Sequence, residues 1–439
     1  MNELRNNKPR YPNFNRAILF IVPSLMITVS SIILFSQLTG LTQQQNNIFS
    51  ITIIAAIILS LLGTAGMQVL IYRVVDDDDY YIDGGAVRGT IIGIVYSVIF
   101  SLFAAVLVAP YFLIVINFSF VEYLYFVYLL FLYSAIWVIV SVFWAANQHK
   151  YPAIIFTFSY LFIFLSTFIS YHINSEYTIT GYTIGTTVLL MLCGIISILV
   201  FRKPKAPHKL INDFIRLKAI IPKNLSSIMF NILYVLAIFL DKIIVWLAQG
   251  LSTGQGIVVT GNYTQGSFMG LVPMFSIAMM AYFTSRTKPL TTNRYEGTFL
   301  EIKNRISQYK KIYQFSFGML LLMALGLAVI ISLIFFLLNL DAGVMKILIT
   351  VAIGAIFFSG VMFNSVVLSI FGKNRISTLA VLCIVFCELA SIPLVTNDIW
   401  FSAMGFTIGS FIGFLISYIS TFRLFSNYEY NMFSYLLKT

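Results

Sequence analysis

Residues 313–338 read YQFSFGMLLLMALGLAVIISLIFFLL and contain no charged side chain. A helix of ~20 predominantly apolar residues is long enough to cross the hydrocarbon core of a bilayer. A helix that is apolar on every side cannot lie on the surface of a soluble protein. This run therefore predicts a transmembrane helix, and the rest of the chain repeats its character.

The composition of the whole chain excludes an ordinary soluble fold. Hydrophobic residues make up 59% of the 439, charged residues make up 10%, and the mean hydropathy is +0.92. Soluble domains are about half apolar and about a quarter charged. The first apolar run is too long for a signal-peptide core and lacks a cleavage site, so we interpret it as a membrane anchor. The predicted class is an all-α integral membrane protein of about 12 transmembrane helices, at 17–38, 48–72, 91–116, 122–146, 152–173, 181–201, 226–249, 264–285, 313–338, 344–371, 376–396 and 399–422.

The positive charges predict the orientation of these spans. Of the 27 Lys and Arg residues, 25 lie in the two termini and in alternate connections, with seven each in 202–225 and 286–312. The opposite loops contain none, and the remaining two are Lys242 and Lys346. Because cytoplasmic loops are enriched in Lys and Arg, we predict a multi-pass protein of the cytoplasmic (inner) membrane with both termini in the cytoplasm. Topology and contact with anionic membrane lipids explain the net charge of +11, so no nucleic-acid partner is expected.

The connection 202–225 lies near the midpoint of the chain. Its three prolines (204, 207 and 222) are expected to break helix, and INDFIRLKAI between them is expected to lie on the membrane surface. Many secondary transporters consist of two repeated halves. We therefore predict an N-terminal six-helix lobe at 1–201, a cytoplasmic linker at 202–225 and a C-terminal six-helix lobe at 226–439.

Asp241, Lys242 and Glu388 are ionisable residues that lie inside predicted spans, away from the span ends. Each costs at least ~2.5–3.5 kcal/mol in the membrane centre, so each requires a functional or structural reason. Adjacent helical residues point about 100° apart, so Asp241 and Lys242 are not expected to pair with each other.

Helical spacing places further polar and aromatic residues beside Asp241, which predicts a substrate cavity. This set comprises Asn231, Tyr234, Asp241 and Trp246 on one broad face of the seventh span, with Lys242, Glu388, Arg73 and Gln265 as further lining residues. Tyrosine and tryptophan offer stacking surfaces and hydrogen bonds that suit sugars. The alternative is a structural interhelical salt bridge, either Lys242 with Glu388 or Asp241 with Arg73. Pro273 and Pro110 are expected to kink their helices and serve as hinges. The run Asp76–Asp79 is interpreted as a solvated loop, with a cation site as the alternative.

The sequence lacks the motifs of common catalytic chemistry. It contains no Walker loop, HExxH, GxSxG or CxxC, and its three histidines do not have metal-site spacing. The three cysteines lie inside apolar runs and give no disulfide framework. We therefore expect no enzyme activity, no cofactor and no metal. A secondary-type transporter or a flippase remains.

The stretch Tyr234–Trp246, YVLAIFLDKIIVW, resembles the signature of the Pel exopolysaccharide exporters. Tyr263, Pro273, Arg286, Tyr295 and Ile302–Lys303 stand at matching places in the next helix and basic loop, and residues 64–92 resemble the loop after the second helix. The N-terminal segment departs from the pattern, because it lacks the glycine-rich opening and the Gly-Pro-Trp of the first helix.

This resemblance implies membership of the MOP flippase superfamily, with two six-helix lobes around a central cavity. It implies export or flipping of a Pel-like polysaccharide, a glycan substrate, and a cytoplasmic glycosyltransferase and other synthase-complex subunits as partners. The alternatives are a lipid-linked oligosaccharide flippase, a cation-coupled multidrug antiporter that titrates Asp241 or Glu388, and a non-transporting scaffold. A pyrophosphate-linked substrate requires a basic cavity, and Lys242 is the clear intramembrane cation.

Overall fold

The structure is a computed structural model that describes residue 41 and residues 43–75, 85–146, 148–201, 210–253, 257–259, 261–292, 299–337 and 341–426. Several predictions lie outside this part of the chain: the first span at 17–38, the run Asp76–Asp79, the side chain of Arg73, Tyr295, and residues 202–209 of the linker.

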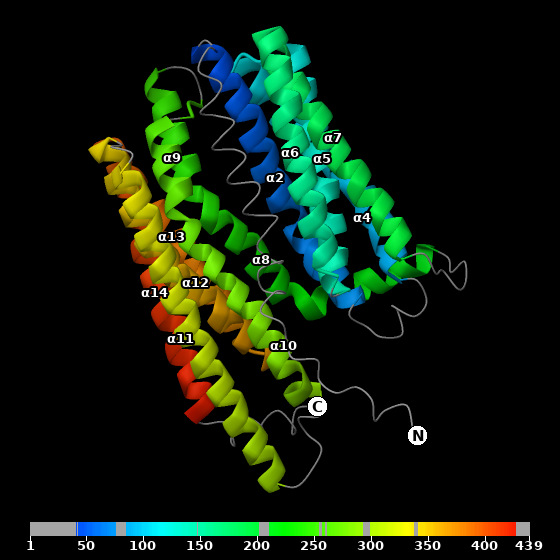
Figure 1. The fold of residues 1–439 in the computed structure, drawn as a ribbon, viewed down its shortest axis with the longest axis vertical. Coiled ribbons are helices and arrows are strands. Elements are labelled where there is room, and N and C mark those ends of the chain that lie inside the picture. Colours follow the sequence, from blue (N-terminus) through cyan, green and yellow to red (C-terminus); the bar gives the residue numbers. More distant parts are fainter. Residues whose placement is uncertain are drawn as a thin grey trace. The chain divides into compact units, whose positions relative to one another are not determined.

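The described residues form helices joined by short connections. Eleven of the helical stretches are long and apolar enough to cross a membrane, and they correspond to the eleven predicted spans that the structure describes. The all-α fold is therefore confirmed. The elements, coloured along the chain in Figure 1, are α2 (Gln43–Val75), α4 (Gly85–Pro110), η1 (Tyr111–Val115), α5 (Phe120–Ala145), α6 (Lys150–Ile173), η2 (Ser175–Tyr177), α7 (Thr178–Val200), α8 (Leu210–Thr253), α9 (Gly261–Gly270), η3 (Val272–Ile277), α10 (Ala278–Thr292), α11 (Phe299–Leu337), α12 (Ala342–Ile370), α13 (Asn374–Val395) and α14 (Trp400–Ser426).

The chain divides into two compact units. Among described residues, one unit holds 41–264 together with 395–397, and the C-terminal unit holds 265–394 and 398–426; we call the first the N-terminal unit. Helix α8 belongs to the N-terminal unit and packs against α2. The division into lobes at 1–201 and 226–439 stays a prediction.

Helix α8 corrects one expectation about the linker. It begins at Leu210 and continues through Pro222, so this proline does not end the helix as predicted. A proline removes one N–H donor and crowds the preceding turn. Helical hydrogen bonding on both sides of the proline allows a long helix to pass through it, as Pro-containing helices do.

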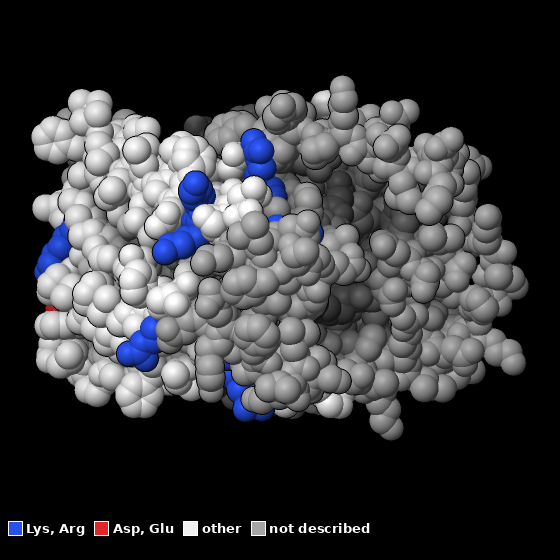
Figure 2. Space-filling view, turned by 90° about the horizontal axis from the view of Figure 1, so that it is seen from below, with Lys and Arg blue, Asp and Glu red and all other residues white. Residues whose placement is uncertain are grey.

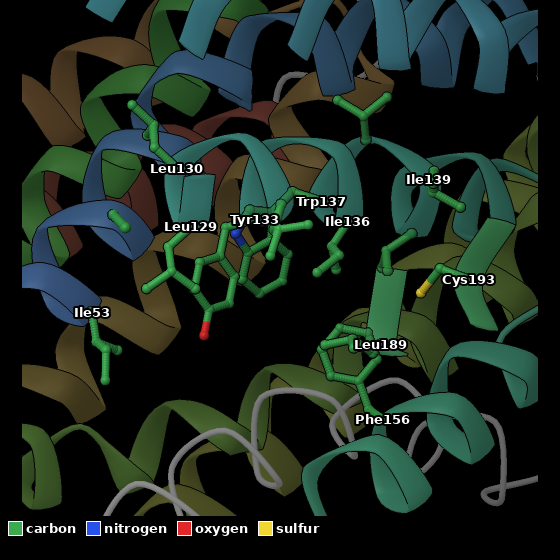
Figure 3. Packing of buried hydrophobic residues seen from close by; sticks show 14 of the residues in the cluster. Ile53, Leu129, Leu130, Tyr133, Ile136, Trp137, Ile139, Phe156, Leu189 and Cys193 are labelled. Carbon is green, nitrogen blue, oxygen red and sulfur yellow. The ribbon is translucent and has the colours of Figure 1, made fainter. Parts of the chain in front are cut away.

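Helix α5 forms the centre of the N-terminal unit. It packs against α2, α4 and α7, and from Leu129 to Ala145 its side chains are buried or half-buried. Figure 3 shows Leu129, Tyr133 and Trp137 of this helix among apolar side chains from neighbouring helices. This part of the helix is covered on every side and has no polar face, which explains why its sequence is apolar all round.

Small residues let α13 and α14 of the C-terminal unit approach closely. Gly405, Gly409 and Gly413 of α14 recur every fourth residue and face α13. A Cβ atom added at Gly409 would lie 2.8 Å from the Cα of Ile384. In membranes, such small-residue ridges allow two helix backbones to pack directly. Helix α14 also lies beside α12 (Figure 1).

Both predicted proline kinks coincide with interruptions of regular helix. Helix α4 ends at Pro110, and the π-helix η1 follows it directly. Pro273 is buried in the 3-10 turn η3, which separates α9 from α10 within one span. Each proline lacks the N–H that an uninterrupted helix requires. The role of either proline as a hinge stays a prediction.

Candidate functional site

A buried ion pair on α8 is the centre of the candidate site. Lys242 Nζ lies 2.8 Å from Asp241 Oδ1, and each side chain is 1% exposed. The expectation that these neighbours do not pair was wrong. The four rotatable bonds of the lysine stem let its ammonium turn back toward the preceding helical turn, where it also donates to the carbonyl of Ile238 at 2.9 Å.

The second oxygen of Asp241 accepts a hydrogen bond from the next helix. Tyr263, in the first turn of α9, is fully buried, and its hydroxyl donates to Asp241 Oδ2 at 3.0 Å. The carboxylate is therefore held by an ammonium on one side and a phenol on the other. Charge-assisted hydrogen bonds of this kind are roughly twice as strong as neutral ones.

Trp246 links α8 to the same neighbouring helix. It lies five residues after Asp241, about 7.5 Å along the helix axis. Its indole N–H donates to Thr264 Oγ1 at 2.9 Å, and its backbone carbonyl accepts from the N–H of Val258 at 3.2 Å. The connection between α8 and α9 therefore runs alongside the last turns of α8.

Asn47 of α2 holds that connection through backbone groups on both sides of Val258. Its Oδ1 accepts from the N–H of Val259 at 3.0 Å, and its Nδ2 donates to the carbonyl of Ile257 at 3.4 Å. Non-helical backbone beside the membrane requires such partners, because an unpaired N–H or C=O is costly there. We call Asn47 with residues 257–259 the strap. It ties α2, α8 and α9 together near Trp246, on the C-terminal side of the ion pair along α8.

Asn231 joins α8 to α2 rather than to α9. Its Nδ2 donates to the carbonyl of Ala65 at 3.1 Å. The next residue, Gly66, leaves room for α8, since a Cβ there would lie 3.1 Å from Ile228 Cγ2. Tyr234 is half-buried on α8. The predicted polar face of α8 is thus shared between two neighbouring helices.

The remaining predicted site residues lie elsewhere or outside the description. Glu388 is fully buried in α13 of the C-terminal unit, where its backbone carbonyl accepts from Ser391 Oγ at 2.7 Å. Gln265 is exposed on α9, and the Arg73 side chain is not among the described ones. The salt bridges of Lys242 with Glu388 and of Asp241 with Arg73 stay predictions.

Tyr263, Thr264 and Asn47 are site residues that the sequence did not reveal. In the sequence, Tyr263 stands out only as a position that matches the family pattern. The useful signal was its place among polar residues at the start of the span that follows Asp241. Within the described residues, no three His, Cys, Asp or Glu side chains are close enough to hold a metal ion.

The carboxylate of Asp241 can exchange one hydrogen-bond donor for another. A hydroxyl group of a bound molecule can replace the Tyr263 phenol as donor to Asp241, while Lys242 continues to neutralise the carboxylate. The indole of Trp246 and the carboxylate of Asp241 both bond to the first turn of α9, at Thr264 and Tyr263.

Comparisons with known proteins identify a family and a fold. The sequence profile of the exopolysaccharide exporter (EPS-E) family PelG matches residues 18–433. No curated protein matches the chain. Three solved structures share its fold at low sequence identity:
a multidrug resistance MATE family transporter of the MOP superfamily in an outward-facing conformation (TM-score 0.67, 13% identity, covering 94% of this chain and 95% of that one); a MOP superfamily transporter from Pyrococcus furiosus (TM-score 0.66, 13% identity, 94% and 95%); and the Vibrio cholerae MATE transporter VcmN in the bent form (TM-score 0.62, 16% identity, 95% and 97%).

Proposed function

The chain belongs to the PelG family of exopolysaccharide exporters, and we propose that the Asp241–Lys242–Tyr263 centre contacts the polysaccharide as it crosses the membrane. Family and fold together support membrane transport or flipping of polysaccharide. They are those of a transporter, and we expect no catalytic step.

The buried ion pair is the observation that carries this proposal. Two charged side chains inside a transmembrane span are costly to insert, and replacing a buried pair by apolar residues often leaves stability unchanged or raises it. A pair that is retained inside a span is therefore better explained by function than by stability. Its carboxylate, phenol and indole are the groups that bind sugar hydroxyls and pyranose faces.

The same pair argues against a lipid-linked substrate. A pyrophosphate carries several negative charges, so its binding requires cations that are not already neutralised. The ammonium of Lys242 lies against the carboxylate of Asp241 and offers no such net charge. A polymer of hydroxyl-bearing sugars fits the centre better.

Basic residues support the predicted orientation. Tyr309 of α11 packs against Phe283, Phe371 and Phe425, which brings together the ends of four segments. Figure 2 shows Lys and Arg side chains on the described part of the molecule seen from below. The described basic side chains near these contacts in the sequence are Arg286, Arg305, Lys310, Lys311, Lys373, Arg375 and Arg423. We infer that this end faces the cytoplasm of the inner membrane, where anionic lipids and the synthase subunits, including a glycosyltransferase, bind.

Complementation of a gene deletion tests the proposed function. Asp241→Asn, Lys242→Ala and Glu388→Gln are expressed in the deletion strain, and cell-surface polysaccharide is measured together with drug sensitivity. Tyr125→Phe is a matched control, since it removes a tyrosine hydroxyl that bonds Thr180 Oγ1 at 2.8 Å, away from α8. We expect the Asp241 and Lys242 variants to lose surface polymer without a change in drug tolerance. Normal polymer with altered drug tolerance would instead show a drug antiporter.

A further inference from the structure

Lys346 is an exception to the charge pattern of the chain. It stands in the first turns of α12, at the end that the topology places outside the cytoplasm, where the loops carry no Lys or Arg. A cation on that side opposes the positive-inside preference. The position of this cation is therefore expected to be explained by the side chains that it contacts.

The contacts of Lys346 build a small, partly exposed cluster with the start of α14. Its Nζ lies 3.4 Å from Asp398 Oδ2 and 3.9 Å from the centre of the Trp400 ring. The side chains of Lys346 and Asp398 are 50% and 46% exposed. A half-exposed ion pair adds little to stability, so stability does not explain why these two charges are kept together.

The indole of Trp400 is fixed in place by hydrogen bonds. Its Nε1 donates to Thr350 Oγ1 at 2.8 Å, and its backbone N–H donates to Asp398 Oδ1 at 2.9 Å. Thr407 Oγ1 donates to the carbonyl of Thr350 at 2.7 Å, which joins α12 and α14 at the residue that also holds the indole. Asp398 thus positions both Lys346 and Trp400, and the cluster exists before any ligand binds.

We propose that Lys346, Asp398 and Trp400 form a subsite that binds one uncharged pyranose unit of the polymer where it leaves the membrane. Each sugar hydroxyl can both donate and accept a hydrogen bond. Of two neighbouring hydroxyls, one can donate to the exposed carboxylate of Asp398 while the other accepts from the exposed ammonium of Lys346. The indole offers the apolar contact that a pyranose ring requires. An amino sugar with a free ammonium binds less well, because its ammonium must give up water at a site where Lys346 and Asp398 already neutralise each other. The inference rests on the proposed function and extends it to the exit side.

The competing explanation for Trp400 is membrane anchoring. Tryptophan is enriched at both membrane interfaces, where it needs no ligand. Anchoring requires neither Asp398 nor Lys346, and it predicts no sugar binding. The chain offers a matched control in Lys150, whose Nζ lies 4.8 Å above the Tyr151 ring at the predicted cytoplasmic end of α6.

Calorimetric titration of the purified full-length protein in nanodiscs tests the subsite. The probes are tetramers of N-acetylglucosamine and of N-acetylgalactosamine, with the glucosamine tetramer as the charged comparison. We expect at least one uncharged probe to bind more tightly than the glucosamine tetramer. Trp400→Ala and Asp398→Asn should weaken binding at least tenfold, and Lys346→Gln should remove the preference against the charged probe. Trp400→Phe should retain most of the affinity, and Lys150→Ala should bind like wild type.

Two results overturn the subsite. The first is an absence of binding by both uncharged probes, and the second is equal affinity in wild type and in folded Trp400→Ala and Asp398→Asn, judged by gel filtration. The cellular assay separates this failure from that of the proposed function. If wild type restores surface polymer to the deletion strain and the Asp398→Asn and Trp400→Ala strains export equally well, only the exit subsite fails. If wild type restores none, the proposed function fails.

Discussion

The hydroxyl of Tyr263 donates a 3.0 Å hydrogen bond to Asp241, on the carboxylate oxygen that Lys242 does not occupy. This bond connects two consecutive helices, α8 and α9, through a carboxylate that is buried inside a transmembrane span. It is therefore a contact that the substrate must disturb if it binds Asp241.

Tyr263→Phe removes this bond while keeping the ring. A hydrogen bond to a charged group contributes about 1.5–3 kcal/mol, so we expect a lower thermal unfolding midpoint of the purified protein. Tyr125→Phe loses a bond between two neutral hydroxyls and should be affected less. An unchanged midpoint for Tyr263→Phe would mean that the hydroxyl adds no stability at Asp241.

The strap gives a second prediction. Asn47→Asp keeps the acceptor for the N–H of Val259 but loses the donor to the carbonyl of Ile257, and its charge repels that carbonyl. Loss of one net hydrogen bond, about 0.5–1.5 kcal/mol, should speed amide hydrogen exchange of residues 257–259 by up to about tenfold. Ser252→Ala, which removes a hydroxyl bonded within its own helix, is the control. Equal exchange rates of residues 257–259 in the two variants would show that Asn47 does not hold this segment.

The three glycines of α14 that face α13 (Gly405, Gly409 and Gly413) give a third prediction. Gly409→Ala places a methyl group 2.8 Å from the Cα of Ile384, a contact that forces the helices apart. Overpacking of this kind typically costs about 1–3 kcal/mol, measurable as a lower unfolding midpoint. Gly326→Ala in α11 is the matched control, because its added Cβ meets nothing within 4 Å and alanine favours helix. Similar midpoints for the two variants would show that α13 and α14 are less tightly packed.

Cysteine labelling tests the orientation. Lys346→Cys and Lys311→Cys are introduced into a variant whose Cys193, Cys383 and Cys387 are replaced by alanine, and a membrane-impermeant maleimide is added to spheroplasts. Both positions are exposed side chains. We expect Cys at 346 to label directly and Cys at 311 to label only after permeabilisation. The reverse labelling pattern would show that the topology is inverted and that the subsite at Lys346 faces the cytoplasm.

The helices were predictable and the site was only partly so. Each described span has the apolar length that a bilayer requires, because the membrane imposes that length on every crossing helix. The polar contacts had no such constraint. Whether Lys242 reaches Asp241 depends on four side-chain torsions, and a helical wheel fixes none of them.

The partners supplied by other segments were the least predictable. Tyr263 reaches Asp241 across a connection whose path depends on Asn47, a residue in a helix far earlier in the chain. A single sequence gives the depth of a residue in the membrane but not which neighbouring helix it faces. Pro222 shows the same limit, since local rules predicted a break where the helix continues.

Replacement of the buried pair by apolar residues tests the central claim most directly. Removal of one partner leaves an uncompensated buried charge and costs about 3–5 kcal/mol, whereas Asp241→Leu together with Lys242→Met removes both charges. The measurement is surface polysaccharide in the deletion strain, normalised to the amount of folded protein in the membrane. We predict a folded double variant that exports no polymer. Export at the wild-type level by that variant would contradict the role of the Asp241–Lys242 pair in transport.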